Sequence, residues 1–158
     1  MSNELRRAFG HYPTGVTVIT TTTQEGRWIG MTANSFSSLS LDPPLVLWSI
    51  ARSSTNYDVF RNATHFAVHV LHSGQAALAR QFATRDCDRF AGLQCEPGRG
   101  GSPLLEDFHA CFDCETHEVL EGGDHVIIVG RVLECRERAG DPLIFYRGRF
   151  LETLGPGA

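Results

Sequence analysis

Small hydroxyl and amide side chains gather in the segment Thr32-Ala33-Asn34-Ser35, and two further serines follow at positions 37 and 38. No bulky charged residue interrupts this segment. Hydroxyls and backbone N–H groups of this kind can bind an anion or the hydroxyls of a polyol chain. A serine-rich strand edge or turn has the same composition, and for the segment taken alone that explanation is the better one.

A second polar cluster, Arg52-Ser53-Ser54-Thr55, is better placed to bind phosphate, and Ser49 lies just before it. The cluster lies at the end of a predicted strand and directly before a predicted helix. The first turn of a helix leaves backbone N–H groups unpaired, and the helix dipole attracts an anion there. Arg52 could add a charge-assisted hydrogen bond. Capping of the helix by Ser54 or Thr55 explains the same residues about equally well.

His125 has the most notable context of the seven histidines, because it follows Asp124 and two glycines and precedes a strongly apolar segment. A histidine at the mouth of a strand can contact a ligand and titrate near neutral pH. A lone histidine more often has a structural role, and nothing in the local sequence excludes that role. The remaining histidines have no better context: His11, His65, His69, His72, His109 and His117.

Two patterns imitate metal or thiol sites. His65, His69 and His72 have a spacing that would suit a metal on a helix, but they straddle a predicted strand, where 65 and 69 share a face and 72 does not. Cys111-x-x-Cys114 is half of a zinc or redox motif without a second pair, and on a strand its two cysteines would face opposite ways. We therefore expect no metal site and no thiol chemistry.

Every one of the 14 basic residues is arginine, and the chain contains no lysine. Schiff-base and P-loop chemistry are thereby excluded, and any phosphate must be held by arginine, hydroxyls or backbone N–H groups. The motifs G-x-G-x-x-G, G-x-S-x-G and H-E-x-x-H are absent from the sequence, so a Rossmann site, a serine hydrolase and a zincin lack support. A net charge of −4 without a basic run argues against nucleic acid as a partner.

The overall composition is that of one globular domain, with 158 residues, 42% of them hydrophobic and 20% charged. The longest apolar stretch, residues 43–48, is far too short to span a bilayer, and the first residues lack the apolar core of a signal peptide. Five cysteines without framework spacing indicate reduced thiols. We expect a cytoplasmic protein that has no membrane association.

Strands dominate the elements that must position these residues. A first helix is predicted from the helical spacing of Leu5, Ala8 and Phe9, and the Glu25-Gly26 turn predicts a hairpin. The predicted strands span residues 16–23, 28–32, 36–41, 45–50, 66–71, 110–117, 126–135 and 143–154. We expect residues 45–50 to be buried on both faces, and residues 110–117 to alternate between a buried and an exposed face.

Two further helices are predicted. Thr55, with Asp58 three residues later, resembles a capping box that opens a helix reaching Asn62, and residues 75–83 form an alanine-rich helix. Residues 84–107 are polar and rich in glycine and proline, so they are predicted to form a long irregular connection. Because no regular βαβ repeat occurs, a mainly β Greek-key barrel with a few short helices fits better than a doubly wound sheet.

An ordered series of short motifs in this chain resembles the flavin reductase family. In chain order the motifs are Pro13-Thr14-Gly15-Val16-Thr17-Val18-Ile19-Thr20, Gly30-Met31-Thr32-Ala33-Asn34-Ser35-Phe36, Ser40-Leu41-Asp42-Pro43-Pro44-Leu45, Phe66-Ala67-Val68, Phe82-Ala83, Asp88-Arg89-Phe90, Gly123-Asp124-His125 and Tyr146-Arg147-Gly148-Arg149-Phe150. Each piece alone is weak, but the ordered series covers about residues 5–154 and is specific.

The resemblance implies a single domain, residues 1–158 with a core at about 5–154, folded as a split β-barrel of the FMN-binding type that usually forms a homodimer. It also implies an NAD(P)H:flavin oxidoreductase that uses NADH or NADPH to reduce FMN or FAD. Members of the family often supply the reduced flavin to a partner flavin-dependent monooxygenase.

The resemblance also implies roles for individual residues. The flavin ring and ribityl chain would be lined by Thr32, Ala33, Asn34, Ser35, Ser49, Phe82 and Ala83. The phosphate would be held by Ser53, Ser54 and Thr55, with Arg89 as a counter-charge. His125 would be the catalytic-site residue on the nicotinamide side, with Phe9 and Tyr146 nearby. It would orient the nicotinamide, because hydride transfer between the two cofactors requires no acid or base from the protein. Arg52 falls where members of the family vary.

Two other functions remain open on the same barrel. One is a non-catalytic flavin-binding or electron-carrier protein, and the other is an enzyme like the pyridoxamine-phosphate oxidases. The Gly123-Asp124-His125 and Pro13-Thr14-Gly15 motifs favour a reductase, because they resemble the reductase branch.

Overall fold

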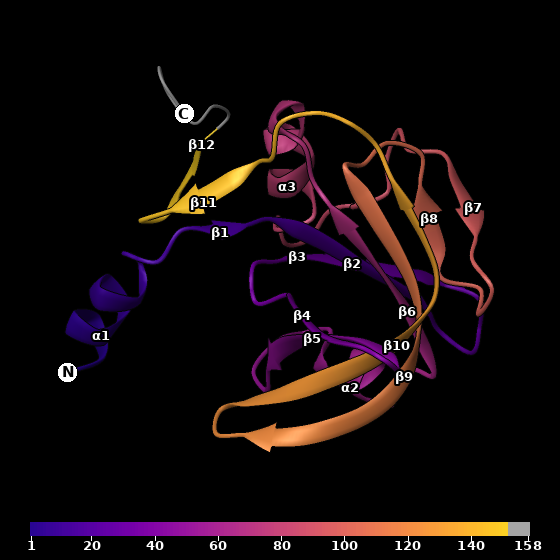
Figure 1. The fold of residues 1–158 in the computed structure, drawn as a ribbon, viewed down its shortest axis with the longest axis horizontal. Helices are drawn as coiled ribbons and strands as arrows, with labels where there is room; N and C mark the ends of the chain where they lie inside the picture. Colours follow the sequence, from indigo (N-terminus) through magenta and orange to yellow (C-terminus); the bar gives the residue numbers. More distant parts are fainter. Residues whose placement is uncertain (152–158) are drawn as a thin grey trace.

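A single antiparallel sheet of seven strands forms the body of the molecule, of which the computed structural model describes residues 1–151 (Figure 1). Its strands lie in the order β3-β2-β6-β9-β10-β5-β4. In that order they span Trp28–Ala33, Thr17–Thr22, His65–Val70, Ala110–Gly122, His125–Glu137, Pro44–Ala51 and Ser37–Leu41. The sheet curls on itself, which confirms the predicted mainly β split barrel with a few short helices.

The two edge strands of this sheet, β3 and β4, are consecutive in the sequence, since only residues 34–36 connect them. A connection of this length reaches about 14 Å at most, so it obliges the edges of the sheet to approach each other. Among the described strands, β3 and β4 stand at opposite ends of the order and share no ladder. The barrel is therefore split at this place, and we call residues 33–37 the seam.

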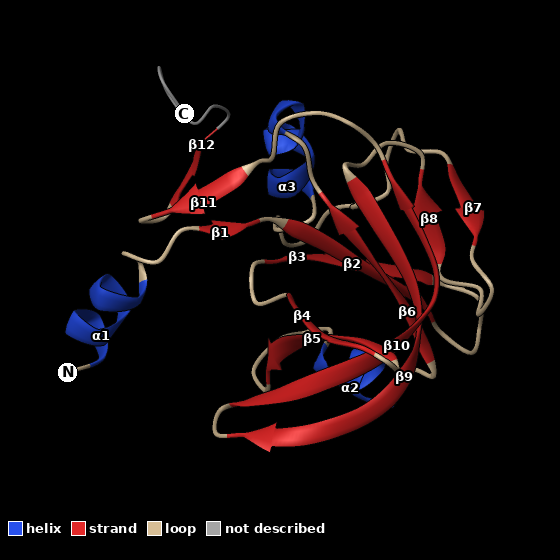
Figure 2. Cartoon of the chain, viewed as in Figure 1, coloured by secondary structure: helices blue, strands red, loops and turns tan. Residues whose placement is uncertain are grey.

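Residues 1–151 also form two small sheets and four short helical segments, which lie beside the barrel or project from it (Figure 2). One sheet has the order β1-β11-β12, from Thr14–Gly15, Ile144–Tyr146 and Arg149–Leu151, and the other pairs β7 (Cys95–Pro97) with β8 (Pro103–Leu105). The helical segments are α1 (Ser2–Phe9), α2 (Tyr57–Asn62), the 3₁₀ helix η1 (Ser73–Gln75) and α3 (Ala76–Gln81). Among the described residues, no helix is long and apolar enough to cross a membrane.

The barrel interior is filled by aromatic and branched side chains. Trp48 lies at its centre, with the ring of Phe60 edge-on at a centroid distance of 5.0 Å and that of Phe66 at 6.1 Å. A side chain on Gly130 would place its Cβ 2.4 Å from the Phe66 ring, so only glycine fits there. A register shift between Val129 and Gly130 bends β10 at the same point. The tight packing fixes the curl of the strands that carry the polar segments.

A projecting arm extends from one side of the barrel and consists of α1 with the β1-β11-β12 sheet (Figure 1). No residue of α1 is buried, and the apolar side chains of Phe9 and Tyr12 are 69% and 77% exposed. Gly10 holds α1 to the small sheet by accepting a hydrogen bond from the Arg147 N–H at 3.1 Å. The arm therefore carries an apolar surface that nothing else in the described chain covers.

Most predicted elements are present, but the predicted burial of two strands is wrong. β5 is buried on one face only, because Val46, Trp48 and Ile50 point into the barrel and the residues between them are half-buried. In β9, Cys111 and Asp113 are buried where the alternation predicted an exposed face. The backbone N–H of Arg99 donates to Asp113 Oδ2 at 2.7 Å, so the loop before β8 covers this side of β9.

Several predicted boundaries also differ; for example, β9 continues to Gly122 beyond the predicted end at 117, and the helix predicted over 75–83 is η1 followed by α3. The α2 helix begins at Tyr57, and its N-cap Asn56 makes no side-chain cap, so the capping box predicted at Thr55 is wrong. The connection 84–107 contains the β7–β8 hairpin. The strand predicted over residues 143–154 is a hairpin that turns at Arg147 and Gly148, both with positive φ; residues 152–154 lie outside the described part.

Candidate functional site

The end of β3 is fastened to α3 through Thr32 and Phe82. The Thr32 hydroxyl donates to the Ala79 carbonyl at 2.6 Å, and the Thr32 N–H donates to the Phe82 carbonyl at 3.2 Å. The Phe82 ring is fully buried and lies so close to Gly30 that a Cβ there would come within 2.5 Å of it. Ala83 follows at the surface. The structure thus brings together Thr32, Phe82 and Ala83, which are 50 residues apart in the sequence.

Ser35 closes the seam onto β5. Its hydroxyl donates to the Ser49 carbonyl at 2.9 Å and accepts from the Ser49 N–H at 3.0 Å. The Ser49 side chain itself is half-buried and makes no hydrogen bond with another described residue. Ala33 ends β3 beside them, and its carbonyl accepts a hydrogen bond from the Thr17 hydroxyl at 2.6 Å. Small side chains therefore line a narrow strip across the seam.

The turn after β5 holds the second polar cluster. The Ser54 hydroxyl accepts from the Asn56 N–H at 3.2 Å, and the Ser54 N–H donates to the Ala51 carbonyl at 3.0 Å, so Ser54 shapes the turn. Ser53 and Thr55 are exposed. Because α2 starts only at Tyr57, these hydroxyls precede the helix and do not cap it.

A cavity of about 440 Å³ joins this turn to the end of the 84–90 loop. Its walls include Trp28, Gly30, Thr55, Arg85 and Arg89. The Arg89 guanidinium is held in position, because Nη1 donates to the Gly30 carbonyl at 2.8 Å and Nε donates to the Thr84 carbonyl at 3.0 Å. A guanidinium has five N–H donors, so others remain for an anionic ligand. Of the residues predicted around the phosphate, Thr55 and Arg89 line this cavity, whereas Ser53 and Ser54 do not.

A second cavity, of about 800 Å³, lies between the barrel and the projecting arm. Phe9 and Asn34 both line it, so the structure brings these two predicted residues together. Tyr146 lies on β11, but the cavity is lined by its neighbours Phe145 and Arg147. Sequence reasoning missed Phe145, and the only available signal was its position beside Tyr146.

The two cavities lie at either end of one strip. Gly30 lines the first cavity and Asn34 the second, and four residues of extended chain separate them by about 13 Å. The strip between them consists of the end of β3 and the start of the seam. It is continuous with Ser49 through the Ser35 hydrogen bonds.

His125 lies at the tip of the β9–β10 hairpin and opposite Ala51 of β5. Its Nδ1 is 2.7 Å from Asp124 Oδ1, and this hydrogen bond lowers the pKa of the Asp124 carboxyl. The Asp124 carbonyl accepts a hydrogen bond from the Arg52 N–H at 2.9 Å. The hairpin tip is thus fastened to the turn that carries Ser53 and Thr55.

The remaining titratable groups of interest are structural. His69 is fully buried, with Nδ1 3.0 Å from the Val18 carbonyl and Nε2 accepting from the Leu105 N–H at 3.0 Å. Burial lowers its pKa to about 4. Burial raises the pKa of Cys111 to about 12 and also raises that of Cys114, so both thiols stay protonated near neutral pH. This agrees with the prediction that the two cysteines carry no thiol chemistry.

Comparison with known sequences gives a consistent family assignment. A family model described as flavin reductase like domain matches residues 9–153. The chain is 50% identical over 149 residues to the FMN reductase (NADH) SmoA of Agrobacterium fabrum, covering 94% of this chain and 84% of that protein. It is 44% identical to the reductase component of a flavin-dependent trigonelline monooxygenase of Acinetobacter baylyi. That match covers 93% of this chain and 47% of the relative, so the chain spans about half of that protein.

Solved structures agree with this assignment. The NADH:FAD oxidoreductase SgcE6 of Streptomyces globisporus, solved in complex with NAD and FAD fragments, has a TM-score of 0.91 and 39% identity. That match covers 99% of this chain and 94% of the other. BorF, the flavin reductase component of a bacterial two-component tryptophan halogenase, has a TM-score of 0.87 and 34% identity, covering 96% and 97% of the two chains.

Proposed function

Because the chain belongs to the flavin reductase family and is a nicotinamide-dependent flavin reductase, we propose that its flavin binds along the strip between the two cavities. The observation that carries this proposal is the strip itself. It joins a cavity that contains a fixed arginine to a cavity with aromatic walls, and the end of β3 connects them.

The flavin phosphate binds at the first cavity. Arg89 supplies the positive charge, and its position is set by the Gly30 and Thr84 carbonyls before any ligand arrives. Thr55 adds an exposed hydroxyl to the same cavity. Since the chain has no lysine, the phosphate must be bound by arginine and hydroxyl groups, without the ammonium group of a lysine.

The flavin ring lies across the seam. Ser35 and Ser49 have small side chains and Ala33 packs against the barrel core, which leaves room for a flat ring against the backbone of β3 and β5. Asn34 lines the cavity at this end of the strip. The bound flavin supplies the hydride acceptor, and the residues of the strip hold it and exclude water.

The nicotinamide approaches from the side of the β9–β10 hairpin. His125 faces this side with an imidazole whose Nδ1 is engaged by Asp124, so the ring has a fixed orientation. Its role is to orient the nicotinamide, because no acid or base is needed for the hydride step. Relatives whose names specify NADH support NADH as the donor.

Both FMN and FAD fit this arrangement. Relatives are named as an FMN reductase and as an NADH-dependent FAD reductase. The phosphate of either flavin would meet Arg89, and the adenylate of FAD would extend toward Trp28, whose ring lies 5.5 Å from that of Phe90 in the same cavity.

The assembled protein is a homodimer that passes reduced flavin to a separate flavin-dependent monooxygenase. The arm supports the first part, because Phe9 and Tyr12 are exposed and would be covered by a second copy of the chain. Relatives named as reductase components of monooxygenases support the second part.

Steady-state oxidation of NADH and NADPH with excess FMN or FAD tests the reductase directly. We expect loss of nicotinamide absorbance that depends on added flavin. A flavin that remains bound through gel filtration, without turnover in any of the four combinations, would contradict the reductase and favour the electron carrier.

A further inference from the structure

We propose that Arg52 is a positioning residue for nicotinamide binding, which locks the tip of the β9–β10 hairpin against the turn after β5. This inference rests on the proposed function, because it assigns His125 at that tip to the nicotinamide side. It gives a role to a residue for which the sequence suggested only a contact with phosphate.

Arg52 contacts three positions of the hairpin tip. Its Nε donates to the Gly123 carbonyl at 3.0 Å, its Nη2 forms an ion pair with the Glu121 carboxylate, and its backbone N–H donates to the Asp124 carbonyl at 2.9 Å. On its own side of the contact, Nη1 donates to the Tyr57 hydroxyl at 3.3 Å. Each of the three guanidinium nitrogens thus has a partner within the protein, so three of its five N–H donors already serve this junction.

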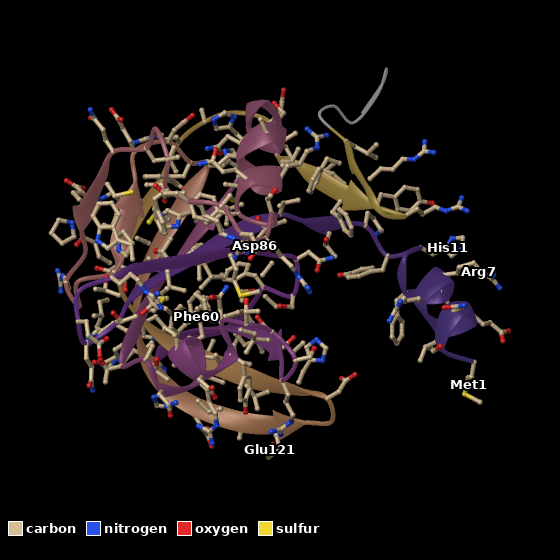
Figure 3. The ribbon with its side chains drawn as sticks, turned by 180° about the vertical axis from the view of Figure 1, so that it is seen from behind. Met1, Arg7, His11, Phe60, Asp86 and Glu121 are labelled. Carbon is tan, nitrogen blue, oxygen red and sulfur yellow. The ribbon has the colours of Figure 1, made fainter. Side chains whose placement is uncertain are left out.

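Apart from Arg52, backbone pairing holds the tip, since His125 lies opposite Ala51 of β5 and Gly122 of β9. β9 and β10 are both 13 residues long, and Figure 3 shows Glu121, next to their turn, at the outer edge of the molecule. Residues 120–124 are all exposed, and two of them are glycines. A turn with no apolar packing and two glycines opens readily, so the contacts of Arg52 restrict its motion.

The geometry links two parts of the proposed site. His125 follows Asp124 directly, and Ser53 follows Arg52 directly. Arg52 therefore joins the segment that orients the nicotinamide to the segment proposed to hold the flavin phosphate. The ladder between His125 and Ala51 runs beside the same junction, which keeps the barrel intact when the side-chain contacts are lost.

The effect of losing Arg52 should appear in nicotinamide use. A single exposed ion pair contributes little to stability, so Arg52→Gln should fold normally. A displaced His125 would raise the KM for NADH, and a misplacement of about 1 Å can reduce a rate by up to roughly 100-fold. We expect kcat/KM for NADH to fall about 10-fold, and the Kd of flavin to change less than about 2-fold.

The experiment compares Arg52→Gln with three further variants. Arg52→Lys keeps the positive charge near Glu121. A lysine lacks the planar guanidinium that also donates to the Gly123 carbonyl, so this variant should recover only part of the activity. Glu121→Gln should have an intermediate effect, and its effect should not add to that of Arg52→Gln. Arg131→Gln is the matched control, because Arg131 is an exposed arginine of β10 away from the tip, and it should leave NADH use unchanged.

Hydrogen exchange of residues 118–126 provides a second measurement that does not depend on catalysis. Arg52→Gln should accelerate exchange there and leave exchange in β2 and β6 unchanged.

Two results would overturn the proposal. One is unchanged exchange at the tip. The other is a weaker flavin affinity with an unchanged KM for NADH, which would assign Arg52 to phosphate binding. Faster exchange at the tip with an unchanged kcat/KM for NADH would show that the tip moves but that His125 does not orient the nicotinamide. That result would overturn the role of Arg52 in nicotinamide binding. Failure of the wild type to oxidise NADH would instead contradict the proposed function.

Discussion

Ser35 and Ser49 form a reciprocal pair in which one hydroxyl satisfies both backbone groups of the other residue, with hydrogen bonds of 2.9 and 3.0 Å. Ser49 belongs to β5, whereas Ser35 belongs to the connection between the edges of the barrel. This pair continues the β4–β5 pairing, in which Ser37 lies opposite Leu47, into the connection that joins the two edges of the barrel.

Ser35→Ala should therefore destabilise the barrel. The variant leaves the Ser49 N–H and carbonyl without their partner in a half-buried position, which costs roughly 1–3 kcal/mol. Chemical denaturation measures the change in unfolding free energy. Ser38→Ala is the control, since this serine is exposed on β4, and it should have no measurable effect. Equal effects of the two substitutions would show that the reciprocal pair has no special contribution.

Arg89→Gln should weaken the binding of FMN by about 10-fold or more, because it removes a charge-assisted contact with the phosphate. Riboflavin lacks the phosphate, so its affinity should change much less. Fluorescence titration of both ligands separates the charge from any general damage to the cavity. Arg61→Gln, on α2, is the control variant. An equal loss for FMN and riboflavin would place the phosphate elsewhere.

The stability of the protein should fall as the pH is lowered from about 6.5 to about 4. Burial holds the pKa of His69 at about 4 in the folded protein, whereas the unfolded chain has the ordinary value near 6.5. The unfolded chain therefore binds more protons within this window, and protonation favours it. The contribution of His69 is complete above pH 6.5, and its loss by pH 4 amounts to about 3 kcal/mol.

Unfolding free energies measured across this range test the effect of His69. His69→Gln should be less stable at neutral pH and should show a shallower dependence on pH. An NMR titration of the folded wild type provides an independent test, because the His69 imidazole should remain neutral at pH 5. A His69 signal that titrates near 6.5 would contradict the prediction.

Phe9→Glu should dissociate the proposed homodimer, because it places a carboxylate on the apolar surface of the arm. Sedimentation velocity measures the change in mass. Leu41→Glu is the control, since Leu41 is a 97% exposed apolar residue on the edge strand β4, and it should leave the dimer intact. A wild-type protein that sediments as a monomer would refute the dimer itself. In Figure 3 the arm, labelled at Met1, Arg7 and His11, extends clear of the barrel.

Elements can be predicted from the sequence where the residues that determine them lie within the element itself. Residues 16–23 are almost all β-branched and predict a strand, which the structure has as β2 over Thr17–Thr22, and the turn before His125 lies where two glycines place it. The burial of Asp113 could not be predicted, because it depends on a loop that returns from residue 99 to cover the strand. The local sequence pattern contains only the alternation along β9 and carries no information about the loop that covers it.

The candidate site shows the same division. Thr55 and Arg89 were predicted by resemblance to short motifs and do meet in one cavity. The contacts of Arg52 with Glu121 and Gly123 were not predictable, because they join positions about 70 residues apart that only the pairing of β5 with β10 brings together. Phe145 was missed because the final strand was predicted without its turn.

The split in the barrel has a thermodynamic consequence. A ligand that contacts both the end of β3 and Ser49 adds attachments across the split between β3 and β4, which share no ladder among the described strands. Occupancy and resistance to unfolding are therefore coupled, and a ligand at 100 times its Kd adds about 2.7 kcal/mol to the folded state. The free energy of unfolding of a protein that releases its flavin to a partner would thus be higher before each release and lower after it. Its melting temperature would then measure how much flavin it is carrying.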